Sequence, residues 1–121
     1  MKQWKDEDFS YVTTTGRRTG KPHQIEIWFG ADGSTIYLLS GGGDRSDWVK
    51  NLQADPAVRV GIGDREWQAR ARVVDDADED ARARRLLAAK YQGWKEGKRM
   101  SGWAMTALPV AMDLEPGEDD R

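Results

Sequence analysis

The chain carries a short basic loop whose residue types suit the binding of a phosphate-like anion. Residues 13–22 read Thr-Thr-Thr-Gly-Arg-Arg-Thr-Gly-Lys-Pro. Glycine lets successive backbone N–H groups converge on an anion, and the fork of arginine donates two parallel hydrogen bonds to phosphate oxygens. A simple solvated turn explains the same residues equally well. On the anion interpretation, the contacts come from Gly16, Arg17, Arg18, Thr19, Gly20 and Lys21.

Few other side chains could do chemistry on their own. The sequence has no cysteine and a single histidine, His23. It therefore predicts no thiol nucleophile, no disulfide and no metal site built from several imidazoles. Acid–base and nucleophilic catalysis have few candidates, so a bound cofactor is expected to bring the reactivity if the protein is an enzyme.

Composition predicts one domain without a membrane span. The 121 residues suit a single domain, expected over residues 9–114, with residues 115–121 as a disordered acidic tail. No apolar run approaches the roughly 20 residues that a spanning helix needs, and the first residues are too polar for a secretory signal. With a net charge of −2, we expect a soluble, cytoplasmic protein that binds no nucleic acid.

Hydrophobic periodicity predicts a mainly β, α+β fold that positions the basic loop between two strands. Six antiparallel strands are expected at 9–14, 24–29, 35–40, 57–62, 66–74 and 106–114. Pro109 predicts that the last strand lies at an edge or a bulge. A sheet of this size with short turns tends to close into a barrel.

Two helices complete the expected fold. The first follows the glycines at 41–43, with Asp44 or Ser46 as its cap, and ends at residues 55–56. The second begins at a capping box of Asp76 and Glu79. One side of it is predicted to carry Ala83, Leu87, Tyr91 and Trp94, and a flexible link over residues 93–102 follows.

Several motifs in this order resemble the deazaflavin-dependent nitroreductase family. They are the basic loop, the Asp-Gly hairpin at 32–33, Ser-Gly-Gly-Gly at 40–43 and Asp-Trp-Val-Lys-Asn-Leu-Gln-Ala-Asp-Pro at 47–56. The similarity runs from about Val12 to Pro109. The loop and the Trp48-x-x-Asn51 helix are together fairly specific, whereas either alone is weak.

The resemblance implies a split β-barrel, like the FMN-binding barrels, with two or three flanking helices. It implies an oxidoreductase that transfers a hydride from reduced coenzyme F(420) to a small quinone, nitro or enone acceptor. Arg17, Arg18 and Lys21 would hold the phosphate and the oligoglutamate tail. The other cofactor contacts implied are Gly16, Thr19, Gly20, His23, Trp28, Ser40, Gly41, Gly42, Gly43, Trp48 and Asn51. The acceptor side would carry Tyr91, Trp94 and Trp103, with Tyr91 as a candidate proton donor or as a wall of the acceptor site. A core contact on its helix explains Tyr91 equally well.

Three departures from the family pattern keep alternatives open. Gly41 stands where members commonly have lysine, His23 where arginine is frequent, and Glu26 where a small or cyclic residue is usual. These changes leave open a preference for FMN in place of F(420). Two other functions also stay open: a non-catalytic cofactor carrier, and a binder of single-stranded nucleic acid through stacking tryptophans. The protein could also assemble as a homodimer.

Overall fold

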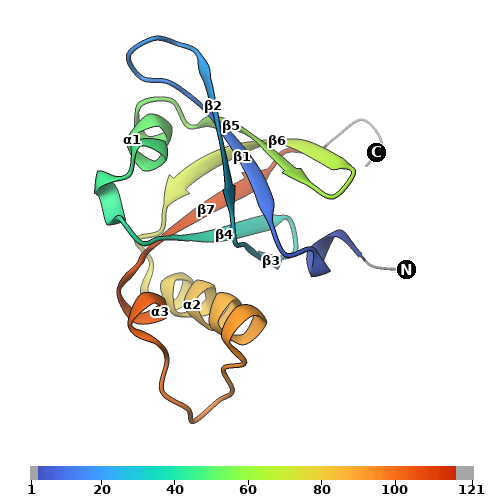
Figure 1. Cartoon of the computed structure of the whole chain (residues 1–121), viewed down its shortest axis with the longest axis vertical. Helices are drawn as coiled ribbons and strands as arrows, with labels where there is room; N and C mark the ends of the chain where they lie inside the picture. Colours follow the sequence, from blue (N-terminus) through green and yellow to red (C-terminus); the bar gives the residue numbers. More distant parts are fainter. Residues whose placement is uncertain (1–2, 117–121) are drawn as a thin grey trace.

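The computed structural model describes residues 3–116 of the chain. This part holds seven strands, three α-helices and two short 3-10 helices (Figure 1). The strands are β1 (Ser10–Thr15), β2 (Pro22–Ile27), β3 (Gly30–Asp32), β4 (Thr35–Ser40), β5 (Ala57–Ile62), β6 (Arg65–Val73) and β7 (Leu108–Leu114). The helices are η1 (Trp4–Asp6), η2 (Gly43–Arg45), α1 (Asp47–Ala54), α2 (Ala77–Gln92) and α3 (Gly102–Thr106).

The strands form one antiparallel sheet whose two edges are neighbours along the chain. The strand order is β2-β1-β5-β6-β7-β4-β3. Only Trp28 and Phe29 separate the end of β2 from the start of β3. Such a link spans at most about 11 Å, so the sheet has to curl until its edge strands approach each other there. In Figure 1, β1 and β2 cross over β7 and β4, which form the opposite wall. The predicted split-barrel fold is confirmed.

The helices cover separate parts of the curled sheet. Helix α1 packs on β1 and β6 and buries Val49 and Leu52 in the main core. Helix α2 packs on β3, β4 and β7, where Leu87 joins a second apolar cluster. The predicted cap of α2 is confirmed, because the Asp76 carboxylate accepts a hydrogen bond from the Glu79 N–H at 2.9 Å. In this way α1 lies beside the β1–β2 loop and α2 lies at the other end of the sheet (Figure 1).

The structure corrects the predicted strand count and the position of Pro109. Seven strands replace six in the described part, because a short strand, β3, precedes the Asp-Gly turn. Strand β7 lies between β6 and β4 rather than at an edge. Proline is tolerated there because the Pro109 carbonyl accepts from Val74, one residue beyond the end of β6. The N–H and C=O of a strand residue point to the same neighbour, so the missing N–H does not weaken the ladder to β4.

The segment after α2 also differs from the prediction. Helix α2 ends at Gly93, so Trp94 lies outside the helix and does not continue the apolar side that carries Leu87. Its indole N–H donates to the Lys98 carbonyl at 2.7 Å. The predicted link is followed by α3, and the last strand begins at Leu108 instead of residue 106.

The structure tests two expectations from composition, but only for the residues that it describes. Within residues 3–116, no helix combines the length and the apolar character needed to cross a bilayer. The predicted acidic tail falls mostly outside the described residues, since only Glu115 and Pro116 of it are described. The domain limits stay predictions.

A charged network fastens α2 to the sheet. Arg72 donates to Glu79 at 2.6 Å and to Asp113 at 2.8 Å, and the Tyr37 hydroxyl donates to Glu79 at 2.7 Å. The Arg72 hydrogen bond, followed by that of Tyr37, lowers the pKa of Glu79 to about 2. The same guanidinium lowers the pKa of Asp113. Burial, followed by the contact with Glu79, raises the pKa of Tyr37.

We predict that Glu79→Gln destabilises the fold at neutral pH by about 2 kcal/mol, because a charge-assisted hydrogen bond to Arg72 is lost. A carboxylate with a lowered pKa stabilises the fold above its unfolded value of about 4.3, and this stabilisation is lost as the pH falls toward 2. Urea unfolding at several pH values should therefore show the variant and the wild type converging in acid.

Glu66→Gln is the matched control, because the Arg59–Glu66 pair is 60% and 63% exposed and exposed pairs contribute little. If Glu79→Gln and the wild type kept a constant difference in unfolding free energy from neutral to acid pH, the network would not be the origin of the stabilisation.

Candidate functional site

The basic loop between β1 and β2 is held in a closed turn by its own backbone. The Gly16 N–H donates to the Lys21 carbonyl, and the Gly20 N–H donates to the Gly16 carbonyl, each at 2.8 Å. Gly20 has φ +73°, a conformation that other residues rarely adopt. A Cβ atom on Gly16 would lie 2.7 Å from the His23 ring. Both glycines are therefore required by the turn and by the approach of His23.

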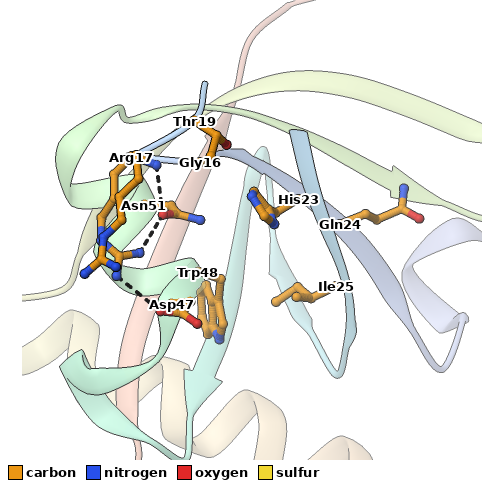
Figure 2. A pocket seen from close by; sticks show the side chains of 10 residues that line it. Gly16, Arg17, Thr19, His23, Gln24, Ile25, Asp47, Trp48 and Asn51 are labelled. Carbon is orange, nitrogen blue, oxygen red and sulfur yellow. Dashed lines mark hydrogen bonds and ion pairs between the residues drawn. The ribbon is translucent and has the colours of Figure 1, made fainter. Parts of the chain in front are cut away.

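A pocket with a volume of about 350 Å³ opens between this loop, β2 and α1. His23 is paired with Thr14 across the β1–β2 ladder, and directly opposed side chains share one face of a sheet. Figure 2 shows Trp48 of α1 and Ile25 of β2 on opposite sides of the pocket. The lining residues are Gly16, Arg17, Arg18, Thr19, His23, Gln24, Ile25, Asp47, Trp48 and Asn51.

The buried side chain of Asn51 connects the loop to α1 and β1. Its Oδ1 accepts from the Arg17 backbone N–H at 3.2 Å and from Arg17 Nη1 at 2.8 Å. Its Nδ2 donates to the Thr14 hydroxyl at 3.2 Å. Arg17 Nη2 reaches Asp47 at 3.2 Å (Figure 2). Arg17 therefore lies along α1, with its charge balanced by Asp47.

Two cations of the loop have no carboxylate partner within residues 3–116. Among the residues described, neither Arg18 nor Lys21 has an acidic partner within ion-pair distance. Arg18 lines the pocket, whereas Lys21 lies on the loop without lining it. Because Asp47 balances the charge of Arg17, Arg18 and Lys21 leave the loop with a net positive charge. This donor set fits a ligand with a phosphate or carboxylate arm.

A second group of predicted residues gathers where the chain crosses from β2 to β3. Trp28 stacks on Tyr91, with ring centroids 4.3 Å apart and planes inclined by 4°. Trp103 meets Trp28 edge-on at 5.5 Å. A Cβ atom on Gly41 would lie 3.8 Å from the Trp103 ring. We call Trp28, Tyr91 and Trp103 the aromatic cluster, with Gly41 beside it. None of these four residues lines the pocket.

The Tyr91 hydroxyl is engaged by the backbone of the same crossing. It accepts from the Phe29 N–H at 3.0 Å, and it can donate to the carbonyl of Asp8 at 2.8 Å or of Phe29 at 3.1 Å. Burial raises the pKa of Tyr91, although the Phe29 hydrogen bond opposes this effect. Lys90 lies over the Phe29 ring at 3.5 Å. Helix α2 therefore fixes the Trp28–Phe29 crossing.

The remaining predicted residues lie outside both groups. The buried Ser40 hydroxyl donates to the Gly43 carbonyl at 2.9 Å and lies 3.0 Å from the Ser46 hydroxyl. This turn leads from β4 through η2 into α1 and does not line the pocket. Trp94 makes no ring contact with the aromatic cluster in the described structure. Gly20 lines a different hollow, on the β5 side of the loop.

Three pocket residues were missed as site residues by the sequence analysis. Ile25 and Gln24 lie within the strand predicted over residues 24–29, and neither was named as a site residue. Asp47 lies four positions before Asn51 on α1, the spacing that brings two side chains together on one side of a helix. That spacing could have indicated Asp47 as a partner for one of the loop arginines.

Comparison with solved structures supports the fold alone, since sequence identities are low. An F(420)-H(2)-dependent reductase superposes with a TM-score of 0.64 and 23% identity, covering 89% of this chain and 94% of that one. The heme storage protein HutZ from Vibrio cholerae superposes with a TM-score of 0.74 and 13% identity, covering 94% of this chain and 86% of that one. The same curled sheet thus occurs in proteins with different ligands.

Comparison with curated proteins and family models identifies the family. An F(420)H(2)-dependent quinone reductase of Mycobacterium tuberculosis is 31% identical over 70 residues, which cover 55% of this chain and 47% of that protein. The chain therefore matches about half the length of this relative. A family model described as F(420)H(2)-dependent quinone reductase matches residues 1–115, and the chain belongs to this family of oxidoreductases that use reduced coenzyme F(420).

Proposed function

We propose that this protein reduces a quinone-type small molecule with reduced coenzyme F(420). The observation that carries the proposal is the pocket beside Arg18 and Lys21, two cations without an acidic partner in the described part of a chain of this family. An acidic phosphate and oligoglutamate arm needs cationic partners that are free to bind it. The further acceptors suggested by the sequence, nitro compounds and enones, belong to the same proposal.

The pocket residues divide the proposed binding between charge and apolar contact. Arg18 offers a planar fork for a phosphate, and Lys21 offers a second charge for the acidic tail. The Thr19 hydroxyl and the His23 ring can add hydrogen bonds. On the opposite side, the half-buried Trp48 presents a flat surface against which a planar ring system can pack.

Reduced coenzyme F(420), when bound, supplies the hydride. The protein's own residues then need only to position the cofactor and the acceptor and to exclude water. This role fits a sequence without cysteine and with a single histidine. Trp28 is implied by the resemblance as a cofactor contact, but it stacks on Tyr91 and meets Trp103 edge-on. We therefore assign it, with these two residues, to an apolar wall for the acceptor. The Tyr91 hydroxyl is bound to backbone groups, so we propose that Tyr91 supports Trp28 in this wall. To donate a proton to the acceptor, the hydroxyl would have to leave its Phe29 and Asp8 partners.

We predict that Arg18→Ala weakens the binding of coenzyme F(420) by about tenfold, the effect of losing one charge-assisted hydrogen bond. Quenching of tryptophan fluorescence during titration measures the dissociation constant. Arg85→Ala, which removes an exposed cation on α2 far along the chain from the loop, is the matched control and should bind as the wild type does. Tighter binding of FMN than of F(420) by the wild type would contradict the proposed cofactor.

We predict that Trp28→Ala raises the KM for a quinone several-fold without changing the dissociation constant of F(420). The side chain is 36% exposed and stacks on Tyr91, so its truncation removes wall area and leaves the pocket intact. Steady-state kinetics with a soluble quinone, a nitroaromatic compound and an enone would rank the acceptors. A weakened F(420) complex with an unchanged quinone KM would instead assign Trp28 to the cofactor.

A further inference from the structure

We propose that Arg17 is a positioning residue, which fixes the basic loop through Asn51 and leaves the contact with the cofactor anion to Arg18. The inference deepens the proposed function and rests on it. By sequence the two adjacent arginines are equivalent candidates for the anion. Their surroundings differ in the structure, because Arg17 is bound to α1 whereas Arg18 has no such contact among the residues described.

The hydrogen-bonding capacity of Asn51 is the first support. An amide oxygen has two lone pairs, and those of Asn51 accept from the backbone N–H and from Nη1 of Arg17. Asn51 is only 4% exposed. If Arg17 turned away to bind a ligand, it would leave a buried oxygen with a lost partner, which is costly. The arginine is therefore held where it is.

The main chain of Arg17 is the second support. Its N–H is bound to the same oxygen as its side chain, so Asn51 fixes the loop backbone at the point where it leaves β1. The amide of Asn51 also donates to the buried Thr14 of β1. One side chain thus sets the distance between β1, the loop and α1, and with it the position of Arg18 above the pocket.

Charge balance is the third support. Arg17 has Asp47 as its ion-pair partner at 3.2 Å, whereas Arg18 has none among residues 3–116. The Arg17 side chain is 24% exposed and that of Asp47 is 85% exposed. An ion pair with an exposed carboxylate adds little to stability, so the position of Arg17 is fixed by Asn51. The main effect of Asp47 is to reduce the positive charge that Arg17 presents to a ligand.

A double-mutant cycle tests the assignment. The dissociation constant of coenzyme F(420) is measured for the wild type, Arg17→Ala, Asn51→Ala, the double variant and Arg18→Ala, each at low and high salt. Hydrogen exchange of residues 14–22 is followed without ligand. We expect Arg17→Ala and Asn51→Ala each to weaken binding about tenfold, and the double variant to be no weaker than the worse single one. Arg17→Ala and Asn51→Ala should each speed hydrogen exchange in the loop.

Arg18→Ala provides the contrast. It should leave loop exchange unchanged and flatten the dependence of binding on salt, because the charge that contacts the anion is gone. Arg17→Ala should keep the salt dependence of the wild type. If Asn51→Ala does not fold, Asn51→Asp replaces it: this variant keeps an oxygen acceptor for Arg17 and should retain slow loop exchange.

Two results separate the possible failures. If Arg17→Ala flattened the salt dependence and left loop exchange unchanged, Arg17 would be a direct ligand and the inference would be wrong while the proposed function stood. If the wild type did not bind F(420), the proposed function would be wrong, and so would the proposed contact between Arg18 and the cofactor anion. Loop exchange would then still decide whether Arg17 and Asn51 fix the loop.

Discussion

The hydrogen bonds of one buried amide, Asn51, hold together the parts from which the pocket is built. Its oxygen binds Arg17 and its nitrogen binds Thr14. An amide that is nearly inaccessible to water has to satisfy its polar atoms within the protein, and here the partners come from a strand and a loop far away in the sequence. The turn is closed by its own backbone hydrogen bonds, and the cost of leaving the Asn51 atoms unpaired holds it against α1. Arg18 then lines the pocket as a cation without an acidic partner among residues 3–116.

A second constraint acts on the sheet. Two residues, Trp28 and Phe29, connect its opposite edges, so the sheet must curl. The tip of this connection is fastened to α2 by Tyr91 and Lys90. The curl brings β2 beside α1 at one end and the aromatic cluster beside α3 at the other. Gly41, next to Trp103, belongs to the turn that leads from β4 into α1, and this turn connects the two regions.

Local patterns predicted most of the fold. The Asp-Gly turn located β4 and alternating apolar residues located β5, both with correct ends, and the capping pattern at Asp76 located the start of α2. Of two features that failed, the position of Pro109 depended on a tertiary contact, whereas the end of α2 depended on the local signal of Gly93. Pro109 is acceptable inside the sheet only because β6 ends beside it, and Trp94 leaves the helical pattern because Gly93 stops α2. In the site, the sequence indicated the loop and Asn51, but it could not distinguish Arg17 from Arg18, since only the fold brings Arg17 to its partners on α1.

The most direct test of this account is a crystal structure of the protein with coenzyme F(420). The account predicts a phosphate or carboxylate oxygen of the coenzyme within hydrogen-bonding distance of the Arg18 guanidinium, with Arg17 still bound to Asn51. A coenzyme bound away from the basic loop, or an Arg17 side chain that has left Asn51 to contact it, would contradict the account.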